Sequence, residues 1–329
     1  MRRLAIIGGG AWGTALAAAA RRAGSLPVLW ARDPAVVEAV NERHENPYFL
    51  PGVTLDPAIA ASSDLRAAME GADAALLVVP AQFLRSVLNL LGDHLRQRFP
   101  VLHCAKGIEV HSLKTMSEVG DEVLPGWPWA VLSGPSFATE VASDLPTAVT
   151  IASRDASLAR SFMAALGNAR FRPYLSEDPI GVELGGAVKN VLAIACGIVA
   201  GRDLGDNARA ALITRGLAEM ARLGVAKGGR AETFRGLSGL GDLVLTCSSA
   251  TSRNYALGLA LGRGQTLDAV LRGGRSVVEG VATAAAVARL ARRLRVGMPI
   301  CQAVEALLHR GESIDAMIDL LLRRPHRSE

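Results

Sequence analysis

A glycine-rich turn near the amino terminus is the feature that most constrains the fold. The segment IIGGGAWGTALA, residues 6–17, places Gly8, Gly10 and Gly13 in a GxGxxG pattern between an apolar run and a helical pattern. Glycines at this spacing permit a tight turn and let a pyrophosphate approach the helix N-terminus, where free N–H groups and the helix dipole favour anions. The alternative is a glycine-rich turn without a ligand. The flanking strand and helix favour a dinucleotide-binding unit.

The order of apolar patterns predicts a sheet followed by helices. Up to about residue 175, short β-like runs alternate with helical segments, which predicts a doubly wound, mostly parallel sheet. After about residue 178, only Ala/Leu-rich helical patterns follow. The predicted strands are 4–8, 27–30, 74–79, 100–105, 129–134, 147–152 and 170–175, and the predicted later helices are 179–201, 207–224, 252–262, 278–294 and 299–309.

Length and this change of pattern together predict two domains. The 329 residues exceed the usual single-core limit of roughly 250 to 300 residues. We expect a Rossmann-like α/β domain over residues 1–178 and an all-helical domain over 179–329, joined at SEDPIG, residues 176–181. The final segment RRPHRSE, residues 323–329, is expected to fray.

Composition argues against several classes of protein. The formal charge of +5 comes from dispersed lysines and arginines without a basic block, which disfavours nucleic-acid binding and permits a small anionic ligand. The opening MRRLAIIGGG has too short an apolar run for a signal peptide. Because no uninterrupted apolar segment reaches about 18 residues, we expect no membrane insertion.

The cysteines and histidines indicate a reduced protein without a metal. Four cysteines lie far apart without a CxxC pair, and they are expected to be packed thiols of a cytosolic protein: Cys104, Cys196, Cys247 and Cys301. The six histidines show no metal-ligand spacing, so no metal is expected.

The segment LWARDP, at the end of the second predicted strand, bears on the choice of cofactor. Doubly wound sheets bind ligands at the carboxyl ends of their strands. Arg32 could hold the 2′-phosphate of NADP, whereas Asp33 could bond the ribose hydroxyls of NAD. The choice stays open, and Arg32 favours NADP slightly because it comes first after the strand. An ordinary polar turn is the simpler interpretation of Asp33.

Residues after the later strands are expected at the same edge of the sheet. They include Pro80, Lys106 of AKG, and Gly134 and Ser136 of SGPSFA. A solvated loop lysine is the simplest interpretation of Lys106. At the cofactor edge it would instead be a candidate to hold a substrate oxygen or phosphate.

One lysine interrupts an apolar helical pattern in GGAVKNVLAI, residues 185–194. Burying the ammonium of Lys189 costs several kcal/mol unless it is paired or loses its proton. Taken alone, Lys189 is expected to lie at a helix edge and reach water. Gly185 and Gly186, one turn earlier, would let a cofactor or substrate approach the helix closely.

The segment TSRN, residues 251–254, precedes another Ala/Leu-rich helix. Ser252 is a predicted N-cap, which places Arg253 and Asn254 beside free helix N–H groups in an arrangement that suits a phosphate. A plain capped helix with a solvated arginine is the alternative. Asp242 lies a short way before this segment, in GLGDLVLTC.

Seven sequence segments are similar, in the same order, to those of the NAD(P)-dependent glycerol-3-phosphate dehydrogenase family. They run from the glycine-rich turn to about residue 284: GGGAWGTALA, CAKGIE, SGPSFATEVA, GVELGGAVKNVLAIA, GLGDLVLTC, SRNYALG and VVEGVATA. The resemblance implies a cytoplasmic homodimer that reversibly reduces dihydroxyacetone phosphate to sn-glycerol 3-phosphate with NAD(P)H, for phospholipid synthesis.

The resemblance also implies the roles of individual residues. Lys189 would transfer the proton. Substrate would be bound by Lys106, Gly134, Ser136, Lys189, Asp242, Ser252, Arg253 and Asn254. The cofactor would contact Gly8, Gly10, Ala11, Trp12, Gly13, Arg32, Lys106, Ala138, Arg253, Val277 and Glu279. Two positions depart from the family, since Ala11 replaces a frequent serine and Phe49 a frequent tyrosine.

A lysine that serves both directions of the reaction needs a pKa near the working pH. Reaching a pKa of about 7 to 8 requires a shift of roughly three units from the value of a free lysine. Burial and a second cation such as Lys106 act in that direction, while Asp242 opposes it or orients the ammonium. Asn190 and Thr246 are further candidates to orient the lysine.

Two rival functions share parts of this pattern. A hydroxyacid or phosphogluconate dehydrogenase would also combine a glycine-rich domain with a helical domain that carries a catalytic lysine, but TSRN with GLGDL favours the glycerophosphate family. A nucleotide-sensing regulator would need neither the buried lysine nor a second phosphate site.

Overall fold

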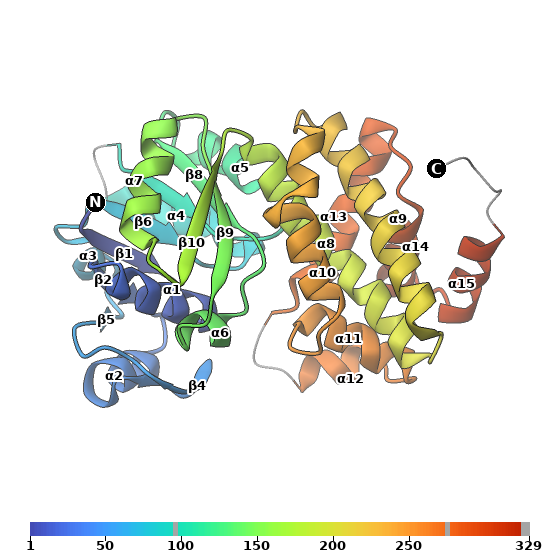
Figure 1. Ribbon diagram of the computed structural model, residues 1–329, viewed down its shortest axis with the longest axis horizontal. Coiled ribbons are helices and arrows are strands. Elements are labelled where there is room, and N and C mark those ends of the chain that lie inside the picture. The colour runs from blue at the N-terminus through green and yellow to red at the C-terminus, as the bar shows by residue number, and fades with distance from the viewer. Residues whose placement is uncertain (95–97, 274–276, 324–329) are drawn as a thin grey trace. The chain divides into compact units, whose positions relative to one another are not determined.

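The computed structural model describes residues 1–94, 98–273 and 277–323 (Figure 1). Unit 1 comprises Met1–Ala105 and Lys114–Glu183, and unit 2 comprises Lys106–Leu113 and Leu184–Glu329. The predicted domain boundary at residue 178 falls shortly before the end of unit 1 and stays a prediction. Within the predicted frayed tail, residues 324–329 lie outside the described residues.

An eight-stranded sheet forms the centre of unit 1, in the order β10-β9-β8-β7-β6-β1-β2-β5. Neighbouring strands are parallel except β8 and β9, which pair antiparallel. The mostly parallel sheet and all seven predicted strands are confirmed. The strands are β1 Arg3–Ile7, β2 Leu26–Trp30, β5 Ala60–Ser62, β6 Ala74–Leu77, β7 Val101–His103, β8 Trp129–Ser133, β9 Thr147–Ala152 and β10 Phe171–Ser176.

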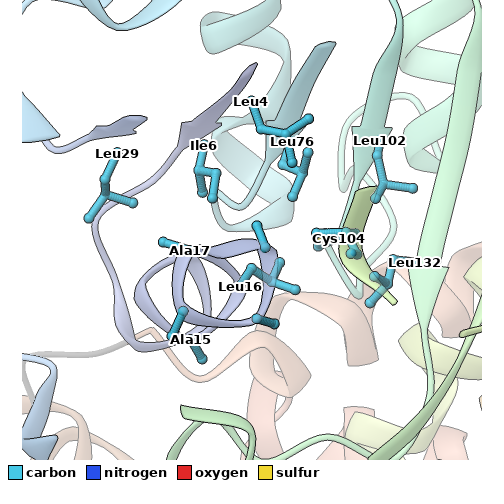
Figure 2. Packing of buried hydrophobic residues seen from close by; sticks show 14 of the residues in the cluster. Leu4, Ile6, Ala15, Leu16, Ala17, Leu29, Leu76, Leu102, Cys104 and Leu132 are labelled. Atoms are coloured by element: carbon cyan, nitrogen blue, oxygen red, sulfur yellow. The ribbon is translucent and has the colours of Figure 1, made fainter. Parts of the chain in front are cut away.

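The sheet is buried on both faces because the side chains of a strand alternate between its two sides. Leu4 and Ile6 of β1 enter one core, while Ala5 and Ile7 enter the other. Figure 2 shows the first core, where Leu16 of helix α1 lies beneath residues of β1, β6, β7 and β8. The predicted strands are apolar at successive positions because both faces of the sheet are buried.

Helices cover the two faces of this sheet. Helices α1, α2, α6 and α7 contribute to the first core, and α3, α4 and α5 contribute to the second. The helices of unit 1 are α1 Ala11–Arg22, α2 Pro34–Arg43, α3 Leu65–Met69, the short η1 Ala81–Phe83, α4 Leu84–His94, α5 Met116–Val123, α6 Ala138–Ala142 and α7 Ala156–Leu166.

An excursion between α2 and α3 was not predicted. It contains the antiparallel pair β3 Glu45–Asn46 and β4 Leu50–Thr54, and then the edge strand β5. These strands are short, and Pro51 and Gly52 interrupt the β pattern within β4. Such residues are typical of turns, so periodicity alone did not mark the excursion as a strand region.

Helices are the only regular secondary structure among the described residues of unit 2, as predicted for the second half of the chain. All five predicted helices are present, whereas α10, α12 and α15 are too short to give a strong periodic pattern. The helices are α8 Pro179–Gly201, which begins in unit 1, α9 Gly205–Ala226, η2 Ala231–Arg235, the π-helical turn η3 Leu237–Gly241, α10 Asp242–Cys247, α11 Arg253–Gly262, α12 Leu267–Arg272, α13 Glu279–Leu294, α14 Pro299–His309 and α15 Ile314–Leu322.

Four glycines let α8 and α11 cross with their backbones in contact. A Cβ atom on Gly197 would overlap the carbonyl oxygen of Tyr255, and one on Gly258 would overlap that of Ile194. The second pair repeats the contact one turn later, since a Cβ on Gly201 would lie 2.9 Å from the Cα of Gly262. The glycines thereby allow α11 to pack closely along the C-terminal half of α8.

Helix α8 is also a core helix. Its length and hydropathy would suffice to cross a membrane, but 89% of its most apolar window is buried inside the protein. All four cysteines are buried free thiols, as predicted: Cys104, Cys196, Cys247 and Cys301.

Candidate active site

The glycine-rich turn of unit 1 has the geometry of an anion cradle. Gly8 has a φ of +134°, and a Cβ atom there would overlap the Val78 carbonyl oxygen. A Cβ on Gly13 would overlap the Gly8 carbonyl oxygen, whereas the space around Gly10 is open. Gly10 is the N-cap of α1 and offers no side-chain acceptor to the helix N–H groups. The turn therefore fits the pyrophosphate of a dinucleotide.

Two predicted cofactor contacts lie close to this turn in the sequence, at the start of α1. Ala11 and Trp12 are partly buried against the first core, and Ala138 at the start of α6 packs on the same core. The indole N–H of Trp12 is buried and has no hydrogen-bond partner among the described residues. A buried donor beside the glycine-rich turn leaves a polar group without a partner among the described residues, at a position that the sequence predicts to contact the cofactor.

The end of β2 separates the two candidates for ribose recognition. Asp33 is the N-cap of α2, and its Oδ1 accepts a hydrogen bond from the Ala35 N–H at 3.0 Å. Arg32 is exposed and forms no ion pair with any residue in the described part of the chain. The carboxylate thus has a structural task as a cap, whereas the guanidinium is available to a phosphate.

The turn after β8 holds two predicted substrate contacts in unit 1. Gly134 has a φ of +136°, and a Cβ atom there would lie 3.0 Å from the Cα of Val149. Ser136 is half-buried, and its hydroxyl donates to the Gly134 carbonyl oxygen at 2.9 Å. Glycine is required at 134 because β9 approaches closely and the backbone is left-handed.

Unit 2 brings Lys189 together with three other polar side chains. Lys189 Nζ donates to Asp242 Oδ1 at 2.5 Å and to Thr246 Oγ1 at 2.8 Å. The second carboxylate oxygen of Asp242 accepts from Lys106 Nζ at 2.7 Å. Lys189 is only 6% exposed, so the expectation that it reaches water at a helix edge is wrong. Two ammonium groups share one buried carboxylate.

The charges of this cluster set the protonation of its members. Burial lowers the pKa of the Lys189 ammonium to about 8; Asp242 opposes this shift and Lys106 adds to it. Burial acts to raise the pKa of Asp242, but the ammonium groups of Lys106 and Lys189 outweigh it and hold that pKa below its ordinary value. The cluster therefore combines a permanent anion with a lysine that can exchange its proton near neutral pH.

Asp242 owes its position to an irregular turn that the sequence did not reveal. The π-helical turn η3 ends directly before Asp242, which is the first residue of α10. A Cβ atom on Gly185 of α8 would overlap the carbonyl oxygen of Ser238 in this turn. The interpretation that Gly185 admits a cofactor or substrate is therefore wrong, because the protein backbone takes that space. Gly185 instead lets η3 pack against α8, the helix that carries Lys189.

A chain of buried amides extends from the lysine cluster. Asn190 Nδ2 donates to the Lys106 carbonyl oxygen at 3.0 Å, and its Oδ1 accepts from Asn254 Nδ2 at 2.9 Å. Asn254 Oδ1 in turn accepts from the Gly280 N–H at 2.9 Å. Asn190 thus holds the backbone of Lys106 and contacts a predicted substrate residue. Gly280, which completes the chain, was not predicted.

The start of α11 has the predicted capping geometry. Ser252 is the N-cap, and its hydroxyl accepts from the Tyr255 N–H at 3.3 Å. Arg253 is exposed and donates to the Val277 carbonyl oxygen at 2.9 Å. Val277 and Glu279 therefore belong to the segment beside Arg253. The free helix N–H groups and the guanidinium make this helix start a candidate phosphate site.

Comparison with known proteins agrees with this geometry. The family model of the NAD-dependent glycerol-3-phosphate dehydrogenase N-terminus matches residues 3–159, and that of the C-terminus matches residues 178–319. The glycerol-3-phosphate dehydrogenase [NAD(P)+] of Rhodospirillum rubrum is 58% identical over 99% of this chain and 93% of its own length. The enzyme of that name from Caulobacter vibrioides is 55% identical over 99% of this chain and 98% of its own length.

A solved structure extends the likeness to three dimensions. The crystal structure of glycerol-3-phosphate dehydrogenase from Coxiella burnetii is 40% identical, covers 98% of this chain and 99% of that chain, and has a TM-score of 0.94. The two family models together span most of the sequence, and the two relatives named above, each more than 50% identical, cover 99% of it. The chain belongs to the NAD-dependent glycerol-3-phosphate dehydrogenase family.

Proposed function

We propose that this protein catalyses the reversible reduction of dihydroxyacetone phosphate to sn-glycerol 3-phosphate with NADPH or NADH. The observation that carries the proposal is the buried Lys189–Asp242–Lys106 cluster in a chain of this family. Relatives more than half identical over nearly the full chain are named glycerol-3-phosphate dehydrogenase [NAD(P)+]. The glycine-rich turn supplies the matching dinucleotide cradle.

Reduction of a ketone needs a hydride and a proton. The bound nicotinamide supplies the hydride, and a group on the protein must protonate the alkoxide that forms. Lys189 is that group in this proposal, since its pKa of about 8 allows it to give a proton in one direction and take one in the other. A proton donor of this kind contributes about 10²- to 10⁴-fold to the rate.

Asp242 and Thr246 hold the lysine ammonium for this step. Asp242 Oδ1 and Thr246 Oγ1 accept hydrogen bonds from two of the three N–H groups of Lys189, at 2.5 and 2.8 Å from Nζ. Thr246 also donates to Asp242 Oδ1 at 3.3 Å, so its hydroxyl is oriented with its lone pairs toward the ammonium. The third proton of Lys189 is the one that the reaction would transfer. Asp242 thus orients the lysine and limits the fall of its pKa.

The substrate phosphate is assigned to the start of α11. Helix N–H groups, the Ser252 hydroxyl and the Arg253 guanidinium are the donors there, and a phosphate prefers such charge-assisted bonds. Asn254 would add its remaining amide N–H, because its carbonyl oxygen already accepts from Gly280. Binding the substrate away from its reacting carbon would lower the entropic part of the barrier. Lys106, Gly134 and Ser136 complete the proposed substrate contacts.

Several finer properties belong to the same proposal. Arg32 is exposed and forms no ion pair with the described residues, and Asp33 caps α2; both observations support a preference for NADP over NAD. Four buried free thiols support a reduced, cytoplasmic setting, and the family resemblance supports a homodimer. In that setting the product would supply the glycerophosphate backbone of phospholipids.

Substrate-dependent oxidation of the cofactor tests the proposed function. The purified protein is mixed with NADPH or NADH and dihydroxyacetone phosphate, and absorbance at about 340 nm is followed. We expect oxidation with this substrate, faster with NADPH, and none with 2-oxoacids such as those used by hydroxyacid dehydrogenases. Folded protein that is inactive with both cofactors, or that prefers a 2-oxoacid, would refute the proposal and favour the rival dehydrogenase.

A further inference from the structure

The amide side chain of Asn46 lies against the glycine-rich turn. Asn46 is the last residue of β3, in the unpredicted excursion, and is only 1% exposed. Its Nδ2 donates to the Gly9 carbonyl oxygen at 3.0 Å and to Thr14 Oγ1 at 2.8 Å. Its Oδ1 accepts from the Phe49 N–H at 3.3 Å. Every one of these contacts lies within unit 1.

These bonds fix the direction of two successive peptide groups. Asn46 holds the carbonyl of Gly9, and Thr14 holds the carbonyl of Gly10 through its hydroxyl and its backbone N–H, each at 3.0 Å. In a planar trans peptide the C=O and the following N–H point in opposite directions. The N–H groups of Gly10 and Ala11 are therefore directed away from Asn46 and Thr14.

That direction decides what the turn can bind. Glycine peptides rotate at little cost, because no Cβ atom restricts φ and ψ. Apart from adjoining residues and its own helix, no atom lies within 4 Å of the place that a Cβ atom of Gly10 would take. A rotated peptide would present a carbonyl oxygen to the pyrophosphate in place of an N–H, which replaces attraction by repulsion. A turn that binds an anion thus needs hydrogen bonds to its carbonyl oxygens on the side away from the anion, so that its N–H groups stay directed toward the anion.

We propose that Asn46 is a positioning residue for the cofactor, which keeps the amides of Gly10 and Ala11 in the orientation that binds the pyrophosphate. The inference rests on the proposed function for the identity of the cofactor. Only an amide side chain combines two N–H donors with an acceptor in this space. Aspartate would keep the acceptor for Phe49 but would place negative oxygen beside the Gly9 carbonyl.

Asn41 of helix α2, which precedes the excursion, provides a matched control. Its Nδ2 donates to the Ala61 carbonyl oxygen at 3.0 Å, and its Oδ1 accepts from the Ala61 N–H at 2.8 Å. Asn41→Asp therefore also removes an amide donor and keeps an acceptor, but it leaves the glycine-rich turn untouched. The dissociation constants of NADPH and NADH are measured by calorimetry for the wild type, Asn46→Asp and Asn41→Asp, together with Tm, kcat and KM.

We expect Asn46→Asp to raise the Kd for both nucleotides by about 10- to 100-fold, as expected for the loss of one to two buried hydrogen bonds. The KM for the cofactor would rise in parallel. At saturating cofactor, kcat would stay within about threefold of the wild-type value, because the orientation of the turn affects cofactor binding and not proton transfer. Asn41→Asp should lower Tm to a similar extent and leave both Kd values unchanged.

Thr14→Val tests the same hydrogen-bonded arrangement of Asn46, Thr14 and the glycine-rich turn if Asn46→Asp does not fold. It keeps the volume of a fully buried residue and removes the hydroxyl that links Asn46 to Gly10, so the Kd should again rise. The inference is overturned if Asn46→Asp, or Thr14→Val in its place, binds both nucleotides as the wild type does, or if Asn41→Asp weakens binding equally. A wild type that binds NADPH but leaves dihydroxyacetone phosphate unchanged would refute the proposed function alone.

Discussion

Replacing Asp242 with asparagine should lower the pKa of Lys189 further. The structure places the Asp242 carboxylate 2.5 Å from the ammonium, where it opposes the effects of burial and of Lys106. At an effective dielectric constant of about 20, a charge pair at this distance is worth roughly 7 kcal/mol. Screening by water that enters the variant would reduce this energy. A quarter of it would still lower the pKa by about one unit.

The pH dependence of kcat/KM for glycerol 3-phosphate measures this change. Oxidation needs the neutral lysine as a base, so the rate should rise with pH through a midpoint near the Lys189 pKa of about 8 in the wild type. Asp242→Asn should move this midpoint down by at least one pH unit. In the reverse direction the ammonium is the acid, so reduction by the variant should decline at correspondingly lower pH.

Two controls separate this effect from general damage. Glu122→Gln removes an exposed carboxylate that pairs with Arg85 and Lys114 in unit 1, and it should leave the midpoint unchanged. Thermal unfolding of each variant checks that the fold persists. A midpoint in Asp242→Asn that is equal to or higher than that of the wild type would refute the assigned electrostatics. A lower kcat/KM with an unmoved midpoint would mean that Asp242 only binds substrate.

Two further predictions follow from the cofactor turn and from the helix crossing. Arg32→Ala should raise the KM for NADPH by about 10-fold or more, through loss of a charge-assisted contact, and leave the KM for NADH nearly unchanged; equal effects on both cofactors would contradict the 2′-phosphate assignment. Gly258→Ala should destabilise the protein by about 1 to 3 kcal/mol in chemical denaturation, because its methyl group would overlap the Ile194 carbonyl, whereas Gly297→Ala, with open space around it, should be neutral. Equal stability of the two glycine variants would show that α8 and α11 can separate without cost.

The local sequence contained enough information to predict seven strands of the large sheet, the main helices and the N-cap of α11. Apolar runs such as LAIIG are buried on both faces of a sheet, and Ser252 caps α11 as its position before the helix predicted. Asp242 and Thr246 lie four residues apart on one helix, so their joint approach to a lysine follows from helical spacing. These features depend on neighbours in the chain.

Other features depend on partners that are distant in the sequence. Lys106 and Asp242 are 136 residues apart, and the short segment Lys106–Leu113 belongs to unit 2 although it follows a strand of unit 1. The role of Asn46 depends on its contact with Gly9, and ENPYFLPG has no periodic pattern that would reveal it. Periodicity reports which face of an element is buried, but it does not report which two polar side chains meet.

The most direct test of the central claim is the turnover of Lys189→Ala. Calorimetry first establishes that NADPH and dihydroxyacetone phosphate still bind, and stopped-flow absorbance then measures NADPH oxidation in a single turnover. The proton-transfer role predicts near wild-type binding and a rate that falls by about 10²- to 10⁴-fold. A variant that binds both ligands and oxidises NADPH within threefold of the wild-type rate would contradict the assignment of Lys189 as the acid and base.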